Sequence, residues 1–469
     1  MDVGGQARVE RKGAALVLLC VAQFVDVLDV NAVIVALHSI GQDLGFSQAG
    51  LQWVVSAYVL FFAGFLLLSG RVADLWGRRL TFVAGLAVFT AASLCCGLSV
   101  SPEMLVVSRA FQGLGAATTA PALSIITTIF AEGRERDRAV AAWTAVAAGG
   151  GAAGLLLGGF ITDVLGWEWI FFVNVPVGVA AIALSHVLLP ESRDPAASHR
   201  LDLLGAGTVT SGLVLLVLGL TRTEEAGFGS PTTLATLGLA ATFFGAFVFV
   251  ERRAVDPLVP LRLFRLHALV GAALVAFALT AATAPVGVLV TLYLQNTLGY
   301  SASLAGLAGL PFSLCVIAGS MMGGRISERI GGRVTMSLGL AVVAASALVT
   351  AGITAEGGVA YVLAGAALSG LGLGFASVAS TARGTSAVEE GKRGLASGFM
   401  NTSAQVGTAL GLAALLTLAA TRTAALSDGA ESAAVALVAG YRLAFLVAAG
   451  VASLGVVAAL YFFRQAKKS

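Results

Sequence analysis

The chain has 469 residues, of which 58% are hydrophobic and only 11% are charged, and its mean hydropathy is +0.92. Because soluble domains usually contain about 25% charged residues, this composition excludes an ordinary soluble protein and indicates many membrane-spanning segments. The net charge of +3 is small, so we expect the lipid bilayer, and no nucleic acid, as a partner of this chain.

Apolar runs separated by charged or turn-rich links recur along the whole chain. Each run is long enough to cross the hydrocarbon core of a bilayer as a helix. We count fourteen spans, near residues 14–36, 51–69, 80–98, 104–130, 139–160, 170–189, 203–220, 234–250, 269–293, 304–322, 335–353, 359–379, 394–418 and 441–463. The sequence therefore predicts an all-α integral membrane protein with 14 transmembrane helices.

The basic residues test this count independently. With a cytoplasmic N-terminus, the cytoplasmic links hold 24 Arg and Lys residues, and the opposite links hold only Arg222, Arg422 and Arg442. Cytoplasmic links are enriched in Lys and Arg, and the omission of one span would destroy this asymmetry. The excess of Arg over Lys, with abundant Ala and Gly, points to a bacterial genome. We therefore expect a bacterial plasma-membrane protein with both termini in the cytoplasm.

The first span contains two acidic residues, Asp26 and Asp29. A carboxylate at the bilayer centre costs about 2.5–3.5 kcal/mol on insertion scales, so two in one span indicate a function. At this spacing both lie on one helical face, and Gln23 extends the face by one turn. We interpret them as groups that bind and release protons and so couple proton movement to a conformational change. A permanent structural contact is the alternative.

Arg109 is a basic residue inside the span at 104–130. An unpaired cation at this depth would be as costly as the aspartates, so a partner is expected. We predict that Arg109 acts on the protonation of Asp29. A contact with Gln112 and the backbone of the first span is the alternative.

Glycines recur every fourth residue in the fifth span, at Gly150, Gly154 and Gly158, and Gly159 follows directly. Small residues at this spacing allow two helices to approach closely. The spacing predicts close helix packing, which is sufficient to explain the glycines.

Two links of the chain resemble each other. GRVADLWGRR begins at Gly70 and GRISERIGGR begins at Gly324, 254 residues later. Such a repeat indicates two related halves, as in transporters built from repeated helix bundles. Glycines permit a tight turn, and the acidic and basic residues could form a latch that opens when the halves rock. The latch residues are Gly70, Arg71, Asp74, Gly77, Arg78, Arg79, Arg325, Glu328 and Arg333.

Polar and aromatic side chains within or near the spans are candidates for a substrate cavity. A site with few polar groups and apolar walls suits amphipathic molecules, although each residue alone is more often a packing residue. The candidates are Gln23, Tyr58, Gln112, Asn296, Phe312, Asn401 and Gln405. Spans 7 and 8 carry no ionisable group in their centres, and we expect them to be lipid-facing accessories.

The chain lacks the patterns of several other classes of protein. Its four cysteines have no metal-ligand spacing, its four histidines are scattered, and no GxxxxGK[ST] phosphate loop is present. We therefore expect no metal, no cofactor, no enzyme activity and no ATP-driven pump.

Several segments resemble one known family. GRVADLWGRR is similar to the loop 2–3 signature of the major facilitator superfamily. LDVNAVIVALHSI, LQWVVSAYVL, RAFQGLGAA, WEWIFFVNVPVG and SGFMNTSAQVGTALG resemble motifs of its fourteen-span drug:proton antiporter family, and they cover both halves of the chain. Leu155 stands where the family's fifth-span motif has proline.

This resemblance implies a fold, a function and site residues. The fold would be two six-helix bundles, at 1–195 and 263–469, with two additional helices and their linkers at 196–262. The resemblance places Asp29 and Arg109 in one proton-relay region, and it places the glycine seam of the fifth span against the C-terminal bundle. The implied function is proton-coupled export of hydrophobic or cationic small molecules such as drugs, dyes or antibiotics. Proton-coupled symport or facilitated import of a specific nutrient is the alternative. We expect a monomer with a small-molecule substrate and protons as the coupling ion.

Overall fold

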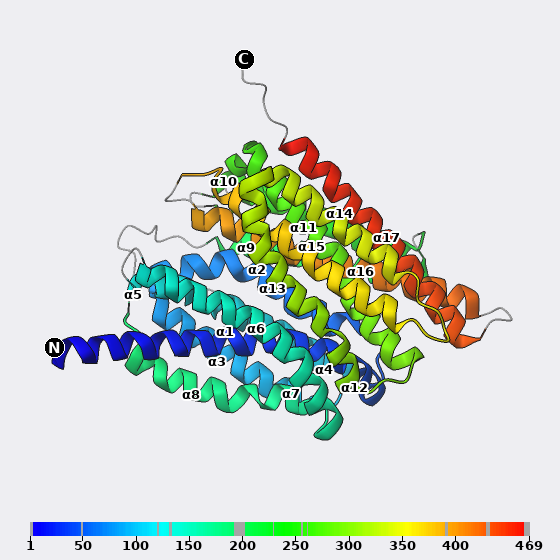
Figure 1. The fold of residues 1–469 in the computed structure, drawn as a ribbon, viewed down its shortest axis with the longest axis horizontal. Coiled ribbons are helices and arrows are strands. Elements are labelled where there is room, and N and C mark those ends of the chain that lie inside the picture. Colours follow the sequence, from blue (N-terminus) through cyan, green and yellow to red (C-terminus); the bar gives the residue numbers. More distant parts are fainter. Residues whose placement is uncertain are drawn as a thin grey trace, which may run out of the picture.

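The computed structural model describes residues 3–47, 50–119, 122–130, 134–191, 202–227, 229–254, 257–259, 261–389, 393–427 and 432–463. The regular structure in these residues is helical, as lipid demands, because a membrane-spanning helix satisfies its own backbone hydrogen bonds. Figure 1 shows the arrangement of the helices; by their place in the sequence, the helices up to residue 188 are called the N-terminal group and those from residue 267 on the C-terminal group, with a helix pair between them.

The N-terminal group contains helices α1 to α8. Their bounds are α1 Val3–Leu44, α2 Gln52–Trp76, α3 Arg78–Gly97, α4 Pro102–Thr119, α5 Ala122–Ile129, α6 Arg134–Val164, α7 Glu168–Phe172 and α8 Asn174–Leu188. Within this group α1 packs on α6 and α8, while α4 packs on α2 and α3.

The inserted pair and the C-terminal group follow. The pair is α9 Leu203–Ala226 and α10 Pro231–Arg253, and a 3₁₀ turn, η1, covers Leu261–Arg265. The C-terminal group comprises α11 His267–Leu292, the π-helical turn η2 Tyr293–Thr297, α12 Ala302–Ala308, α13 Leu310–Ile330, α14 Gly332–Thr350, α15 Val359–Thr385, α16 Arg393–Ser427 and α17 Ala433–Phe462. The two groups meet where α2 packs on α16 and where α6 packs on α12.

Eleven helices in the described residues are long and apolar enough to cross a membrane. Two others have shorter apolar stretches, Gln52–Leu66 in α2 and Gly149–Val164 in α6. The predicted span at 104–130 corresponds to α4 and α5, and the two residues between these helices lie outside the described residues. A multi-pass membrane protein follows from these helices, while the count of fourteen spans stays a prediction.

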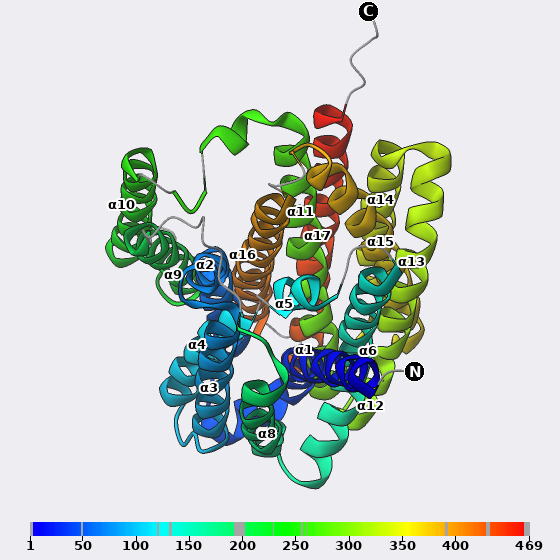
Figure 2. The same ribbon diagram turned by 90° about the vertical axis from the view of Figure 1, so that its left-hand side faces the viewer.

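Helix α9 contacts both groups. It runs antiparallel to α2: the Gln52 amide donates to the Thr221 hydroxyl at 2.9 Å, and Gly64 leaves room for Thr210 twelve residues further along α2. Helix α9 also packs on α16. Helix α10 packs on α9 at the edge of the molecule (Figure 2). That the two helices are lipid-facing accessories stays a prediction.

The repeated links have the same backbone conformation. Gly77 joins α2 to α3 with φ 112° and ψ 138°, and Gly331 joins α13 to α14 with φ 84° and ψ 147°. Only glycine adopts this region readily. The spacing of 254 residues in the sequence is thus matched by two equivalent helix–turn–helix corners.

Candidate functional site

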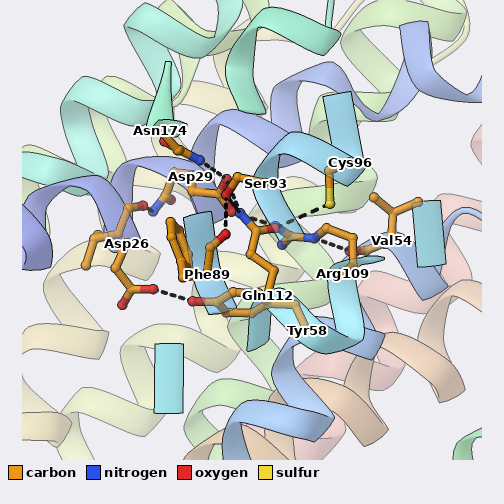
Figure 3. Close-up of polar contacts among 12 residues, drawn as sticks. Asp26, Asp29, Val54, Tyr58, Phe89, Ser93, Cys96, Arg109, Gln112 and Asn174 are labelled. Carbon is orange, nitrogen blue, oxygen red and sulfur yellow. Dashed lines mark hydrogen bonds and ion pairs between the residues drawn. The ribbon is translucent and has the colours of Figure 1, made fainter. Parts of the chain in front are cut away.

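A polar cluster lies inside the N-terminal group, where apolar side chains would be expected (Figure 3). It draws Asp29 from α1, Arg109 and Gln112 from α4, and Asn174 from the start of α8. Ser93 and Cys96 of α3 complete it. These residues come from four helices, so the cluster depends on how the whole group packs.

Asp29 is the centre of the cluster and has no exposed surface. Its Oδ2 accepts a hydrogen bond from Arg109 Nη1 at 2.5 Å, and the same contact is an ion pair. Its Oδ1 accepts from Gln112 Nε2 at 2.9 Å and from Asn174 Nδ2 at 2.7 Å. Both carboxylate oxygens therefore have donors, as a buried charge requires.

Arg109 is also fully buried. Its Nη1 donates to Gln112 Oε1 at 2.6 Å, and its Nε donates to the backbone carbonyl of Val54 at 2.9 Å. The guanidinium carbon lies 4.5 Å from the centre of the Tyr58 ring, a cation–π distance. Arg109 thus contacts both Asp29 and Gln112, and its backbone partner belongs to α2 and not to the first span. Its effect on the protonation of Asp29 stays a prediction.

Asp26 has a different environment from Asp29. The Tyr58 hydroxyl donates a hydrogen bond to Asp26 Oδ1, and the Asp26 residue remains half-buried. Asp26 and Asn174 both line a cavity of about 10 Å³ between α1, α3 and α8, which is close to the least space that one water needs. Asp26 is therefore near Asn174, which binds Asp29, and no cation in the described part of the chain forms an ion pair with it.

The contacts of Asp29 join α1 to two other helices. Its charge pairs with Arg109 of α4, so loss of that charge would weaken the contact between α1 and α4. It also accepts hydrogen bonds from Gln112 of α4 and Asn174 of α8, so a change at this carboxylate reaches both helices. The part of the two aspartates in proton coupling stays a prediction.

The other predicted cavity residues lie on separate elements. Tyr58 and Gln112 are buried within or beside the cluster. Gln23 on α1, Phe312 on α13 and Gln405 on α16 are half-buried, while Asn401 on α16 and Asn296 in η2 are exposed. Their role as a substrate cavity stays a prediction.

The first predicted latch contacts the end of α8. Arg79 Nε lies 3.5 Å from Glu191 Oε2, and its Nη1 donates to the backbone carbonyl of Leu189 at 3.3 Å. Arg78 Nη1 donates to the Thr128 hydroxyl of α5 at 2.6 Å. These contacts stay within the N-terminal group.

The remaining latch residues are placed as follows. Gly70 is exposed, and the side chains of Arg71 and Asp74 lie outside the described part of the structure. In the second link, Arg325 and Arg333 flank Glu328, which lies in the last turns of α13. The latch function stays a prediction.

The glycine seam of α6 faces a different helix from the one that the family resemblance implied. An added Cβ at Gly154 or Gly158 would collide with Leu28 or Ala32 of α1, and at Gly150 it would make a tight contact with Phe24 of the same helix. Gly159 alone of the four approaches the C-terminal group: an added Cβ would lie 2.5 Å from the carbonyl oxygen of Ala302 in α12. The first three share a face at a spacing of four residues, and Gly159 lies about 100° around the helix from Gly158.

Sequence reasoning assigned no role to Asn174 or Ser93. Asn174 stands inside the segment WEWIFFVNVPVG, where it is a polar residue in an apolar run. Ser93 accepts a hydrogen bond from Gln112 Nε2 at 2.9 Å and donates to the Phe89 carbonyl. The position of Asn174 in an otherwise apolar segment was the available signal, whereas serines are common in membrane helices.

Comparison with known proteins agrees with this architecture. The family model described as "Major Facilitator Superfamily" matches residues 19–412 and 272–469. A bacterial homologue of the human lysosomal transporter Spinster, solved in an inward-facing and unoccupied conformation, superposes with a TM-score of 0.63. That alignment has 19% sequence identity and covers 96% of this chain and 98% of the homologue. At this identity the likeness concerns the fold alone.

Two curated relatives are more similar in sequence. The chain is 42% identical to a cephamycin export protein of Amycolatopsis lactamdurans over 428 residues, which cover 90% of this chain and 87% of the relative. It is 39% identical to a puromycin resistance protein of Streptomyces alboniger over 459 residues, covering 96% and 91%.

Proposed function

Since this chain belongs to the major facilitator superfamily, we propose that it exports antibiotic or other drug-like small molecules from bacterial cells in exchange for protons. The similarity to proteins of cephamycin export and puromycin resistance along most of the chain is the observation that carries export. The buried carboxylates of α1 support protons as the coupling ion.

The proposed architecture is the fourteen-span form of the fold. Two six-helix bundles, at 1–195 and 263–469, would rock about a central cavity, with α9 and α10 inserted between them in sequence. Both termini would be cytoplasmic, since this orientation puts most Arg and Lys residues inside. The protein would work as a monomer, and the latch links would lie on the cytoplasmic side.

In the proposed mechanism, the two aspartates have separate parts. Asp26 exchanges protons with the cavity because it is half-buried and its hydrogen-bond partner in the described residues is the Tyr58 hydroxyl. Asp29 converts proton binding into movement because its protonation removes the charge that pairs with Arg109 and so weakens the contact between α1 and α4. The driving force is adequate, since one charge moving through 100 mV provides about 2.3 kcal/mol.

The experiment follows protons in everted membrane vesicles with an acidic interior. Puromycin, a cephamycin and a panel of cationic and neutral drugs are added to wild type, Asp26→Asn and Asp29→Asn. The control is Asp43→Asn, because Asp43 contacts Trp167 outside the cluster. We expect drug-triggered proton release in wild type and the control, and its loss in both Asp26→Asn and Asp29→Asn.

The other outcomes separate the alternatives. Proton movement into the same compartment as the substrate would support symport of a nutrient and contradict export. Drug-triggered proton release that survives Asp29→Asn but not Asp26→Asn would identify Asp26 as the proton carrier and show that Asp29 is not needed for proton release. A wild-type protein that moves neither drug nor proton would contradict drug export.

A further inference from the structure

The last turn of α6 and the first turn of α12 join the two helix groups through a carboxylate. Asp163 Oδ1 accepts a hydrogen bond from the backbone N–H of Ala302 at 3.0 Å, and Oδ2 accepts from the N–H of Ser303 at 2.8 Å. Asp163 belongs to the N-terminal group, whereas Ala302 and Ser303 belong to the C-terminal group. One side chain thus spans the boundary between the groups with two hydrogen bonds.

These bonds complete the start of α12. The first N–H groups of a helix lack partners within the helix, and an anionic acceptor at this position is favourable. The Ser301 hydroxyl accepts from the N–H of Leu304, which leaves the N–H groups of Ala302 and Ser303 for Asp163. If α6 moved away from α12, both N–H groups and the carboxylate would have to be solvated by water.

The backbones of the two helices touch beside this carboxylate. An added Cβ at Gly159 of α6 would lie 2.5 Å from the Ala302 carbonyl oxygen. An added Cβ at Gly306 of α12 would lie 2.1 Å from the carbonyl oxygen of Leu155. The glycines on both helices therefore allow α12 to come within hydrogen-bonding distance of Asp163 on α6. Any larger side chain would push the helices apart.

A second polar contact crosses the boundary nearby in sequence. Gln295, in the π-helical turn η2, donates its amide to the backbone carbonyl of Val35 in α1 at 2.9 Å. Gln295 is only 5% exposed and Val35 is fully buried. π-Helical turns within longer helices often mark functional positions. The segment from η2 to α12 is thus bound to the N-terminal group at both of its ends.

We propose that Asp163 and Gln295 form a gate at the outer end of the cavity, which must break before the substrate can leave. This proposal rests on the alternating access and the orientation proposed above. The gate holds α6 and α1 against the segment from η2 to α12. Each contact pairs a side chain with backbone groups across the boundary: Asp163 accepts from N–H groups of the C-terminal group, and Gln295 donates to a carbonyl of the N-terminal group. The contacts therefore depend on how the helices are placed and not on the identity of a partner side chain.

Asp163 stays charged at neutral pH. It lies in the exposed last turn of α6, beyond the apolar run at 139–160. Partial burial raises its pKa, but the hydrogen bonds from Ser303, Ser301 and Ala302 outweigh burial and hold the pKa below its ordinary value of 3.8. The gate therefore needs movement of the helices, and not a change of external pH near neutrality, to open.

The test measures from which side of the membrane the cavity can be reached. The four native cysteines are replaced, and Gln23→Cys supplies a reporter on the half-buried face of α1. A membrane-impermeant maleimide is applied to intact cells. Asp163→Ala and Gln295→Leu should each raise outside labelling of the reporter by about three- to tenfold, the range expected from the net contribution of a hydrogen bond to stability.

Matched controls come from the same end of the molecule. Asp43→Asn removes a carboxylate that contacts Trp167 within the N-terminal group, and Gln42→Leu removes an amide that contacts His38 within α1. Both should leave labelling unchanged. Equal labelling of wild type and Asp163→Ala would overturn the gate. The same conclusion would follow if the control variants raised labelling as much as the gate variants.

A cross-link tests the gate without relying on loss of a side chain. In the Asp163→Cys and Ser303→Cys double variant, a disulfide should form on oxidation and abolish outside labelling of the reporter. Labelling should return when reductant is added. Failure of the pair to cross-link, or labelling that persists after cross-linking, would contradict the proposal. Labelling is measured independently of drug export, so a failure of the gate can be told apart from a failure of the exporter function.

Discussion

Asp29 and Arg109 form a buried ion pair, with 2.5 Å between Oδ2 and Nη1 and no exposed surface on either side chain. The pair joins α1 to α4, and Asn174 extends it to α8. Because a buried ion pair contributes little net stability over an apolar pair of the same shape, its presence here is better explained by a function in which the pair breaks and re-forms.

Removing one partner of this ion pair should lower the stability of the protein. Arg109→Ala leaves the Asp29 carboxylate buried without a cation, and we expect a loss of about 3–5 kcal/mol in the free energy of unfolding. The combination of Arg109→Gln with Asp29→Asn removes both charges and should recover much of that loss, while drug-driven proton release remains absent. Thermal unfolding in detergent and vesicle assays measure the two effects. If the double variant were less stable than Arg109→Ala, the unpaired Asp29 charge would not be the main cause of the stability lost in Arg109→Ala.

The Tyr58 hydroxyl should matter for proton exchange more than for stability. Tyr58→Phe removes the donor to Asp26 but keeps the ring that lies against the Arg109 guanidinium. We expect stability within about 1.5 kcal/mol of wild type. Drug-driven proton release should be slower by several-fold in the vesicle assay. Tyr58→Leu also removes the ring and should reduce stability further. Equal proton release by wild type and Tyr58→Phe would exclude the hydroxyl from the relay.

The sequence was sufficient to predict which ionisable residues need partners, but not all of those partners. An aspartate and an arginine inside apolar runs each require a counter-charge, and this physical necessity identified Asp29 and Arg109. Asn174 escaped because a single amide near a helix start has many possible uses. Only the packing of α8 on α1 brings it to Asp29.

The roles of the glycines were likewise predictable from the sequence only in part. Their spacing in α6 predicts that some helix comes close, because a missing side chain leaves space on one face. The spacing does not identify that helix, so the partner had to come from the family resemblance. The implied partner, the C-terminal bundle, was wrong for the three glycines that pack on α1. In contrast, the repeat at Gly77 and Gly331 carried its structural meaning in the sequence, since a shared turn needs the same residue at the same offset.

These two corner glycines provide a matched pair of variants. Both have positive φ, so Gly77→Ala and Gly331→Ala should each cost about 1–3 kcal/mol of backbone strain. At Gly77 an added Cβ would also lie 2.2 Å from Glu191 Oε1, whereas at Gly331 it would meet nothing within 4 Å. Gly77→Ala should therefore lower the melting temperature more.

The larger decrease in melting temperature of Gly77→Ala should come from the contact of the added methyl group with Glu191. Glu191→Ala in the Gly77→Ala background frees the space beside the turn, and the difference from Gly331→Ala should then decrease. If Gly331→Ala proved the more damaging of the two single variants, local contacts at Gly77 would not control the outcome. Melting curves in one detergent compare the three variants with wild type directly.

Close packing of α1 on α6 should be required for the polar cluster. An added Cβ at Gly158 would lie 2.4 Å from Cα of Ala32, a backbone atom that cannot turn aside, so Gly158→Ala must displace α1. Ala32 is three residues from Asp29 in the same helix, and the displacement should therefore disturb the contacts of Asp29 with Arg109 and Asn174. We expect drug-driven proton release to be lost while the protein still inserts into the membrane.

Gly149 is the matched control for Gly158 because it lies in the same helix, and an added Cβ there would meet nothing within 4 Å. Gly149→Ala should retain transport and stabilise α6 by up to about 1 kcal/mol, the difference in helix propensity between alanine and glycine. Both variants add one methyl group to one helix, so a difference between them can arise only from what that methyl meets. Transport that is equally reduced in both would instead mean that α6 must remain flexible along its length, and the contact with α1 would lose its special importance.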